Sequence, residues 1–296
     1  MRVRMILTAV GAVLSLATTL VLASPASPVN QERISVKVEG TGADLILIPG
    51  LASSAEVWAD LASTLRQHHR LHLVQIAGFA GLPAVAGPGG KVVAPIADGI
   101  ADYIRRQGIE APAIIGHSLG GEVALMLGAR YPDLVGRLMV VDALPFYSLL
   151  FGSAVTSKTA APHAAQARDA MLRASTEQNE TMHKATIARL VKTEALRPSV
   201  LIAATRSDRR TVADATYELM VTDLRPELGR IKVPVDVVYA YDDLYGVPAS
   251  DVDAMFRDAY VSTPEVNFKR IDGSFHFVML DQAERFTSVV VEFLDR

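Results

Sequence analysis

A serine between two glycines is the strongest chemical signal in the chain. Residues 116–120 read Gly-His-Ser-Leu-Gly, a G-x-S-x-G motif that follows the apolar run Ala113–Ile115 and leads into a helical pattern near Glu122. Glycines without Cβ atoms let such a turn cross its neighbours closely, so that the serine can hold a strained backbone and project its Oγ above a sheet. The N-terminal N–H groups of the following helix would stabilise an anion formed there. The motif therefore predicts Ser118 as a nucleophile.

A serine hydroxyl needs a base with a pKa close to ambient pH, and His276 is the best candidate in the chain. It follows an apolar strand pattern in a Gly-Ser-Phe-His turn before the final helical segment. Three other histidines, in a helix-to-strand junction, read as solvated surface, and the rest lie beside the serine or in a strand-poor region. These six are His68, His69, His72, His117, His163 and His183.

The third member of a serine triad is an acid that accepts a hydrogen bond from the base and sets its tautomer. Three aspartates end strand-like segments and could do this: Asp142, Asp242 and Asp243. The losing candidates would stabilise turns, a common role for aspartate at strand ends. The residues alone leave the choice open.

Aliphatic and β-branched runs alternate with amphipathic stretches along the chain. This alternation predicts an α/β fold with a mostly parallel central sheet and helices on both faces. The predicted strands are Ile34–Val38, Leu45–Ile48, Leu71–Ile76, Ala113–Ile115, Leu138–Val141, Val235–Tyr239 and Val266–Ile271. The predicted helices are Glu56–Gln67, Val92–Gln107, Glu122–Arg130 and Gln282–Leu294.

Residues 145–230 lose the strand signal and become rich in Ala, Arg and Thr, with a helical character. This stretch lies between two predicted strands, so we expect a helical cap over the carboxyl edge of the sheet, where open α/β sheets bind ligands. The alternative is a helical layer with no role in access. The expected domain organisation is a core of residues 30–144 and 231–296 with a cap or lid of residues 145–230.

The chain resembles the α/β-hydrolase superfamily, in particular small-molecule esterase-type members with a helical cap. The motifs that carry the resemblance are Ile48-Pro49-Gly50-Leu51-Ala52-Ser53-Ser54, Gly116-His117-Ser118-Leu119-Gly120, Tyr239-Ala240-Tyr241-Asp242-Asp243 and Asp272-Gly273-Ser274-Phe275-His276-Phe277. Their order of serine, acid and histidine matches the order in the superfamily. One departure is Pro49-Gly50, where family members commonly have His-Gly.

The resemblance implies roles for particular residues. The acid would be Asp243, and the backbone N–H groups of Leu51 and Leu119 would form the oxyanion hole. The implied reaction is hydrolysis of a small-molecule or lipid-like carboxylic ester through an acyl-enzyme. A C–C bond hydrolase, a lactonase, a peptidase or a non-catalytic binding module of the same fold are the alternatives.

The N-terminus has the order of a secretory signal peptide. Two arginines precede a largely apolar run from Met5 to Leu22, and small residues follow, with Ala23 and Ala26 as cleavage candidates. We expect residues 1–23 to be removed, the protein to be exported to the periplasm or secreted, and no stable membrane insertion thereafter. An uncleaved N-terminal anchor helix is the alternative.

The composition excludes several classes of protein. A net charge of −3 over 296 residues leaves no basic stripe for nucleic acid, and the absence of cysteine excludes disulfides and lipid attachment through cysteine. No His, Cys, Asp or Glu grouping has metal-ligand spacing, so we expect neither a metal nor a cofactor. A small-molecule ester is the expected partner.

Overall fold

The computed structural model describes residues 33–85 and 90–296. The predicted signal peptide, residues 1–23, lies outside the described residues. None of the helices in the described part of the chain is both long and apolar enough to cross a membrane.

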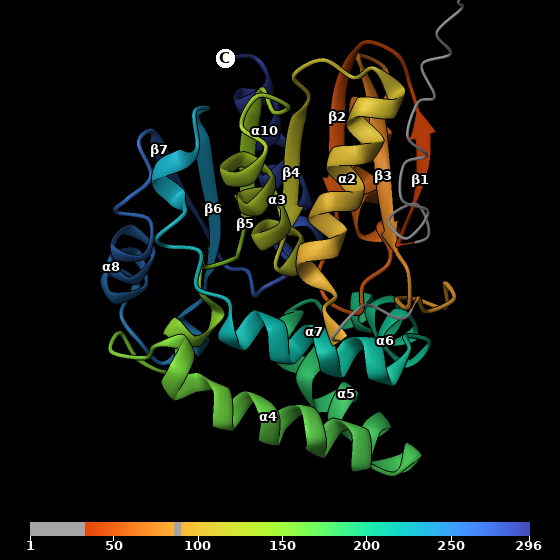
Figure 1. The fold of residues 1–296 in the computed structure, drawn as a ribbon, viewed down its shortest axis with the longest axis vertical. Helices are drawn as coiled ribbons and strands as arrows, with labels where there is room; N and C mark the ends of the chain where they lie inside the picture. The colour runs from red at the N-terminus through yellow and green to blue at the C-terminus, as the bar shows by residue number, and fades with distance from the viewer. Residues whose placement is uncertain (1–32, 86–89) are drawn as a thin grey trace, which may run out of the picture.

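A seven-stranded sheet runs through the centre of the molecule (Figure 1), in the order β1-β3-β2-β4-β5-β6-β7. Only β1 runs antiparallel to its neighbour β3; the other adjacent pairs are parallel. The predicted mostly parallel sheet is therefore confirmed. The strands are β1 (Ile34–Glu39), β2 (Ala43–Ile48), β3 (His69–Ile76), β4 (Ala113–His117), β5 (Arg137–Val141), β6 (Val235–Tyr241) and β7 (Val266–Asp272).

The inner strands are apolar on both faces because each face is covered by helices. In β2, Ile46 and Ile48 face one buried cluster, whereas Leu45 and Leu47 face the other. The first cluster includes residues of α2 (Val93–Gln107), α3 (Leu119–Arg130) and α8 (Ala249–Ala259). The second includes residues of α1 (Ala59–Leu65), α9 (Val278–Asp281) and α10 (Ala283–Leu294). Helices thus pack on both faces, as predicted.

Several helical features differ from the predictions. The segment predicted as one helix over Glu56–Gln67 is a 3₁₀ turn, Ala55–Trp58, followed by α1. The helix α8 was not predicted, although its buried residues Val252, Phe256 and Ala259 recur at helical spacing.

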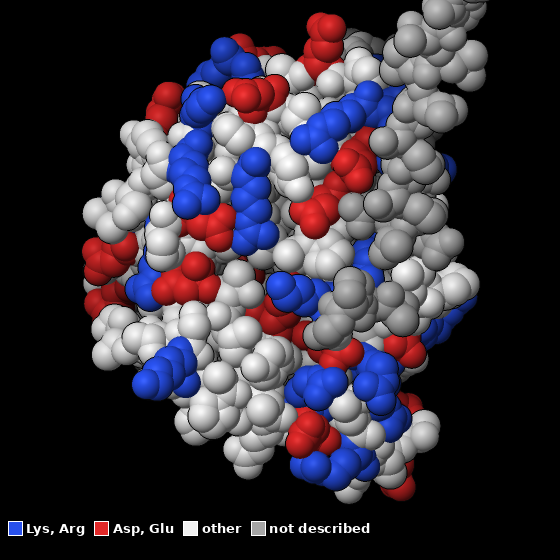
Figure 2. Space-filling view, in the orientation of Figure 1, with Lys and Arg blue, Asp and Glu red and all other residues white. Residues whose placement is uncertain are grey.

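Between β5 and β6 the chain forms helices and no strand in a stretch that is fully described. They lie below the sheet in Figure 1, beyond the carboxyl ends of the parallel strands, where a helical cap was predicted. On the face shown in Figure 2, basic and acidic side chains are interspersed over both the sheet layer and the cap. The cap helices are α4 (Ser157–Arg173), α5 (Thr176–Leu190), α6 (Arg197–Thr205) and α7 (Arg209–Val221), with 3₁₀ turns at Tyr147–Phe151, Glu194–Leu196 and Leu228–Arg230.

Candidate active site

Ser118 occupies a strained turn between β4 and α3. Its backbone has φ 54° and ψ −120°, which is rare for a residue with a side chain. Its N–H donates to the carbonyl of Val141 at the end of the neighbouring strand, over 2.9 Å. This bond fixes the turn to β5, and the Ser118 residue is partly exposed between buried neighbours.

The flanking glycines are required by close backbone contacts. A Cβ on Gly116 would lie 2.0 Å from the carbonyl oxygen of Gly120, and a Cβ on Gly120 would lie 2.3 Å from the carbonyl oxygen of Ile48. Neither position can accept a side chain without moving the backbone. The predicted reason for the two glycines is therefore confirmed.

The loop after β2 lies directly against the serine. A Cβ on Gly50 would come within 3.1 Å of the Ser118 Cβ. Leu51 follows Gly50 in the chain, and Leu119 follows Ser118 as the first residue of α3, so both predicted oxyanion donors are chain neighbours of this contact. The N-terminus of α3 adds its dipole to the same place.

The imidazole of His276 contacts an aspartate. Its Nδ1 lies 2.6 Å from Oδ2 of Asp142, which directly follows β5. The other oxygen of Asp142, Oδ1, accepts the N–H of Ala240 over 2.9 Å, and the Asp142 N–H donates to the carbonyl of Val238 over 2.7 Å. Both groups are mostly shielded, with 21% of the His276 side chain and 15% of the Asp142 side chain exposed. The aspartate is thus held by β6 while it contacts the histidine.

This geometry corrects the prediction that Asp243 orients His276. Asp243 lies in a 3₁₀ turn, Asp243–Tyr245, and accepts a hydrogen bond from the Tyr241 hydroxyl over 3.1 Å. Its neighbour Asp242 is the N-cap of that turn, accepting the N–H of Leu244, and pairs with Lys192 over 2.5 Å. Asp242 thus has the turn-stabilising role expected of a losing candidate, whereas Asp243 bonds to Tyr241.

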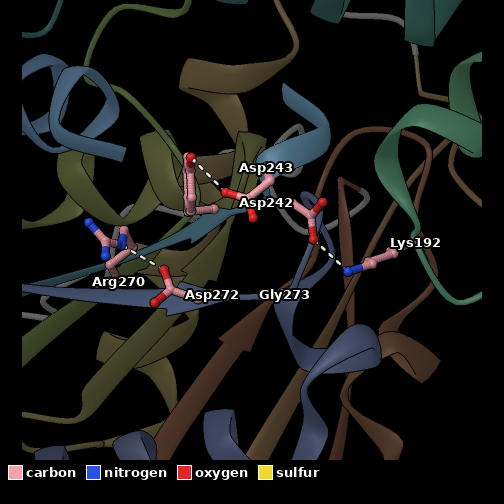
Figure 3. Close-up of a pocket in the computed structure, with 7 residues that line it drawn as sticks. Lys192, Asp242, Asp243, Arg270, Asp272 and Gly273 are labelled. Carbon is pink, nitrogen blue, oxygen red and sulfur yellow. Dashed lines mark hydrogen bonds and ion pairs between the residues drawn. The ribbon is translucent and has the colours of Figure 1, made fainter. Parts of the chain in front are cut away.

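Asp242 and Asp243 instead line a cavity of about 390 Å³, shown in Figure 3 with Lys192 reaching across from the cap. Arg270, Asp272 and Gly273 complete its charged wall together with Tyr241. Ser118, Asp142 and His276 are not among its lining residues. This cavity is therefore separate from the serine and histidine.

A second histidine holds the backbone of the first. His117 is fully buried, and its Nε2 lies 3.0 Å from the carbonyl oxygen of His276. Because a carbonyl only accepts, Nε2 must carry the proton. Its Nδ1 has no hydrogen-bond partner among the described residues. Burial and the nearby His276 hold the pKa of His117 well below its ordinary value, so the ring stays neutral.

This role of His117 was not predicted from the sequence, although its position beside the serine in a buried turn was a signal for it.

The prediction that His72 is solvated was wrong. His72 is 3% exposed and lies between the Tyr103 hydroxyl and Asp44, each 2.8 Å away. Within the described residues, no group of three or more His, Cys, Asp or Glu side chains could hold a metal ion.

Known proteins with related sequences and folds were compared with the chain. The sequence profile of the alpha/beta hydrolase family matches residues 45–289. A pimeloyl-(acyl-carrier protein) methyl ester esterase from Vibrio cholerae is 27% identical over 272 residues, which cover 88% of this chain and 97% of that protein. A putative carbamate hydrolase from Yersinia enterocolitica is 35% identical over 101 residues, 34% of this chain and 36% of that protein.

Solved structures share the fold over most of the chain. The enol-lactonase from Burkholderia xenovorans has a TM-score of 0.72 at 20% identity and covers 89% of this chain and 96% of that chain. An esterase from Exiguobacterium antarcticum has a TM-score of 0.73 at 18% identity, with coverages of 89% and 96%. On its sequence match and its fold, the chain belongs to the alpha/beta hydrolase family.

Proposed function

We propose that this chain is a serine hydrolase that cleaves a carboxylic ester of a small or lipid-like molecule. The observation that carries the proposal is the 2.6 Å contact between Asp142 and Nδ1 of His276, at the same sheet edge as the strained Ser118. A carboxylate on Nδ1 holds the proton there and leaves Nε2 free to accept a proton. The proposal also draws on the esterase relative that matches over most of the chain.

In the proposed reaction, Ser118 Oγ attacks the ester carbonyl while Nε2 of His276 takes the hydroxyl proton. Backbone N–H groups of Leu51 and Leu119 stabilise the oxyanion. Collapse of the tetrahedral intermediate breaks the C–O bond, and His276 gives its proton to the departing alcohol. Water then attacks the acyl-enzyme with His276 again as base, which releases the acid and restores the serine.

The test is covalent labelling followed by turnover. A fluorophosphonate should label the wild-type protein at Ser118 and should not label Ser118→Ala. A series of p-nitrophenyl esters of graded acyl length should then be hydrolysed, with kcat lowered by on the order of 10⁴ to 10⁶ in Ser118→Ala and His276→Ala. A wild-type protein that neither reacts with the fluorophosphonate nor hydrolyses any ester would favour the non-catalytic binding module.

We also propose that the cap, residues 145–230, acts as a lid over the site. Its helices lie over the carboxyl edge of the sheet (Figure 1). A lid would set which esters enter, so exchanging cap residues should change the preferred acyl length more than the rate on the best ester.

Export is a further proposal, supported by the charged, apolar and small-residue order of residues 1–23. Expression of the full chain should yield a mature protein outside the cytoplasm that begins at residue 24 or 27. A full-length protein retained in the membrane fraction would favour the uncleaved anchor.

A further inference from the structure

The loop that carries His276 is hydrogen-bonded on both sides of the histidine, on one side to the cap and on the other to α9. On one side, the N–H of Phe277 donates to the carbonyl of Leu190, the last residue of α5, over 3.1 Å. On the other side, the N–H of Phe275 donates to Oδ2 of Asp281 over 3.0 Å. Asp281 ends α9, five residues after the histidine. Both peptide neighbours of the base are therefore fixed.

The same carboxylate also holds the cap. Its Oδ2 accepts the N–H of Lys192 over 3.0 Å, and its Oδ1 accepts the N–H of Thr193 over 2.8 Å. Three backbone donors from two separate segments thus converge on Asp281. Hydrogen bonds to an ionised acceptor are about twice as strong as neutral ones, so this cluster is a firm connection between the cap and the loop.

The cap segment is held from its other side as well. Arg197, the first residue of α6, donates from Nε to the carbonyl of Val191 over 2.9 Å and from Nη2 to the carbonyl of Lys192 over 3.2 Å. The side chain of Lys192 extends to Asp242 at the end of β6, as Figure 3 shows. The segment Leu190–Thr193 is consequently held by hydrogen bonds on both sides.

We propose that Asp281 is a positioning residue for His276, and that through it the cap segment Leu190–Thr193 sets the position of the base. This inference rests on the proposed serine-hydrolase function. A shift of the cap that pulls on this segment would displace the histidine from its contact with Asp142 and, in the proposed reaction, from Ser118. Cap position and reactivity of the serine are therefore coupled through the Asp281 carboxylate and the backbone bond from Phe277 to Leu190.

The decisive variant is Asp281→Asn. Both carboxylate oxygens accept backbone N–H groups, so an amide in either orientation places an NH₂ group against at least one donor. A displacement of about 1 Å in a catalytic group can lower the rate by about 10²-fold. We expect kcat to fall by about 10- to 100-fold with KM changed by less than about threefold, and labelling by a fluorophosphonate to slow in parallel.

A second variant, Thr193→Pro, removes one donor and leaves the carboxylate intact. Thr193 has φ −72°, which proline adopts without strain. Its kcat should fall several-fold. If Asp281→Asn fails to fold, Thr193→Pro still tests the inference.

The control is Thr156→Ala, which removes the side-chain cap of α4. This change lowers the stability of the cap by about 1 kcal/mol without altering a contact of the segment Leu190–Thr193 or of the loop that carries His276. It should leave kcat unchanged. A loss of kcat in Thr156→Ala equal to that in Asp281→Asn would mean that any loosening of the cap has the same effect, which would overturn the specific role of Asp281.

Amide hydrogen exchange provides a readout that does not depend on activity. In Asp281→Asn, exchange should accelerate in residues 190–193 and 273–280 relative to the wild type. If the wild-type protein does not react with esters or the fluorophosphonate, the proposed function fails, and the exchange data alone then support or overturn the connection. If kcat, labelling and exchange in both Asp281→Asn and Thr193→Pro stay within twofold of the wild type, the inference is wrong.

Discussion

Replacing Asp142 by asparagine should abolish most of the activity, because of the two hydrogen bonds that the carboxylate makes. Its Oδ1 accepts the backbone N–H of Ala240, and its Oδ2 contacts Nδ1 of His276. The asparagine must present one oxygen and one NH₂ group to these two partners. The backbone amide can only donate, whereas an imidazole can exchange its tautomer, so the oxygen should stay with Ala240.

The NH₂ group would then face Nδ1 of His276 and move the ring proton to Nε2. A histidine protonated at Nε2 cannot take the proton of the serine hydroxyl. In a serine triad this tautomer error lowers kcat by about 10⁴, which corresponds to about 5 kcal/mol of transition-state stabilisation. We expect a loss of that size in Asp142→Asn, with the thermal stability largely kept because the backbone bond of residue 142 to Val238 remains.

The matched control is Asp243→Asn, the same chemical change at the position favoured by the family resemblance. The amide oxygen of asparagine can still accept the Tyr241 hydroxyl, and no contact with His276 is involved. Its kcat should stay within about threefold of the wild type. The assay is steady-state hydrolysis of the best p-nitrophenyl ester together with the rate of fluorophosphonate labelling. A larger loss in Asp243→Asn than in Asp142→Asn would refute the reasoning.

Three further changes test the surroundings of the site. In Gly116→Ala the new Cβ would lie 2.0 Å from a backbone oxygen, so we expect destabilisation by about 3 kcal/mol or more, seen as a large fall in thermal midpoint or loss of soluble protein. Glu122 is buried with an unpartnered oxygen among the described residues, and burial raises its pKa well above 4.5. Its unfolded form loses the proton above about pH 4.5 while the folded form keeps it, so the wild type loses stability as pH rises; Glu122→Gln should remove this loss and raise the thermal midpoint at pH 8. The pKa of buried His117 is lowered from 6.5, so the unfolded form binds an extra proton below about pH 6.5 and stability falls as pH decreases from there. His117→Phe should flatten this decline between pH 7 and pH 5 and lose about 1 kcal/mol at pH 8 from the missing bond to His276, as measured by chemical denaturation.

The elements near the serine could be predicted because their signals are local. The run Ala113–Ile115 is buried on both faces, and the helix after the serine carries eleven consecutive buried residues, Leu119–Ala129. The structure starts that helix at Leu119, three residues before the predicted Glu122. The difference has a simple cause. Glycine has a low helix propensity, so Gly120 and Gly121 delayed the predicted start of the helix, whereas in the structure the helix begins directly after Ser118.

The cap could be predicted as a helical insertion but not as a partner of the base. The connection between Asp281 and the N–H groups of Lys192 and Thr193 joins residues 89 and 88 positions apart. Backbone N–H donors are present at every residue except proline, so no residue type marks where they converge. The bond from His117 to the His276 carbonyl was hidden for the same reason.

By itself, the sequence determined the α/β class, the parallel sheet, the turn that bears Ser118 and the histidine after the last strand. Strand and helix periodicity and glycine-bounded turns depend on residues that are close together in the chain. Only the tertiary structure decided which aspartate meets His276. Three aspartates end strands and are chemically equivalent in the sequence. The choice of Asp142 depends on the pairing of β5 with β6, whose Ala240 N–H holds one carboxylate oxygen, whereas Asp243 lies in a 3₁₀ turn and bonds to Tyr241. These are relations between segments about 100 residues apart, and only packing brings them together.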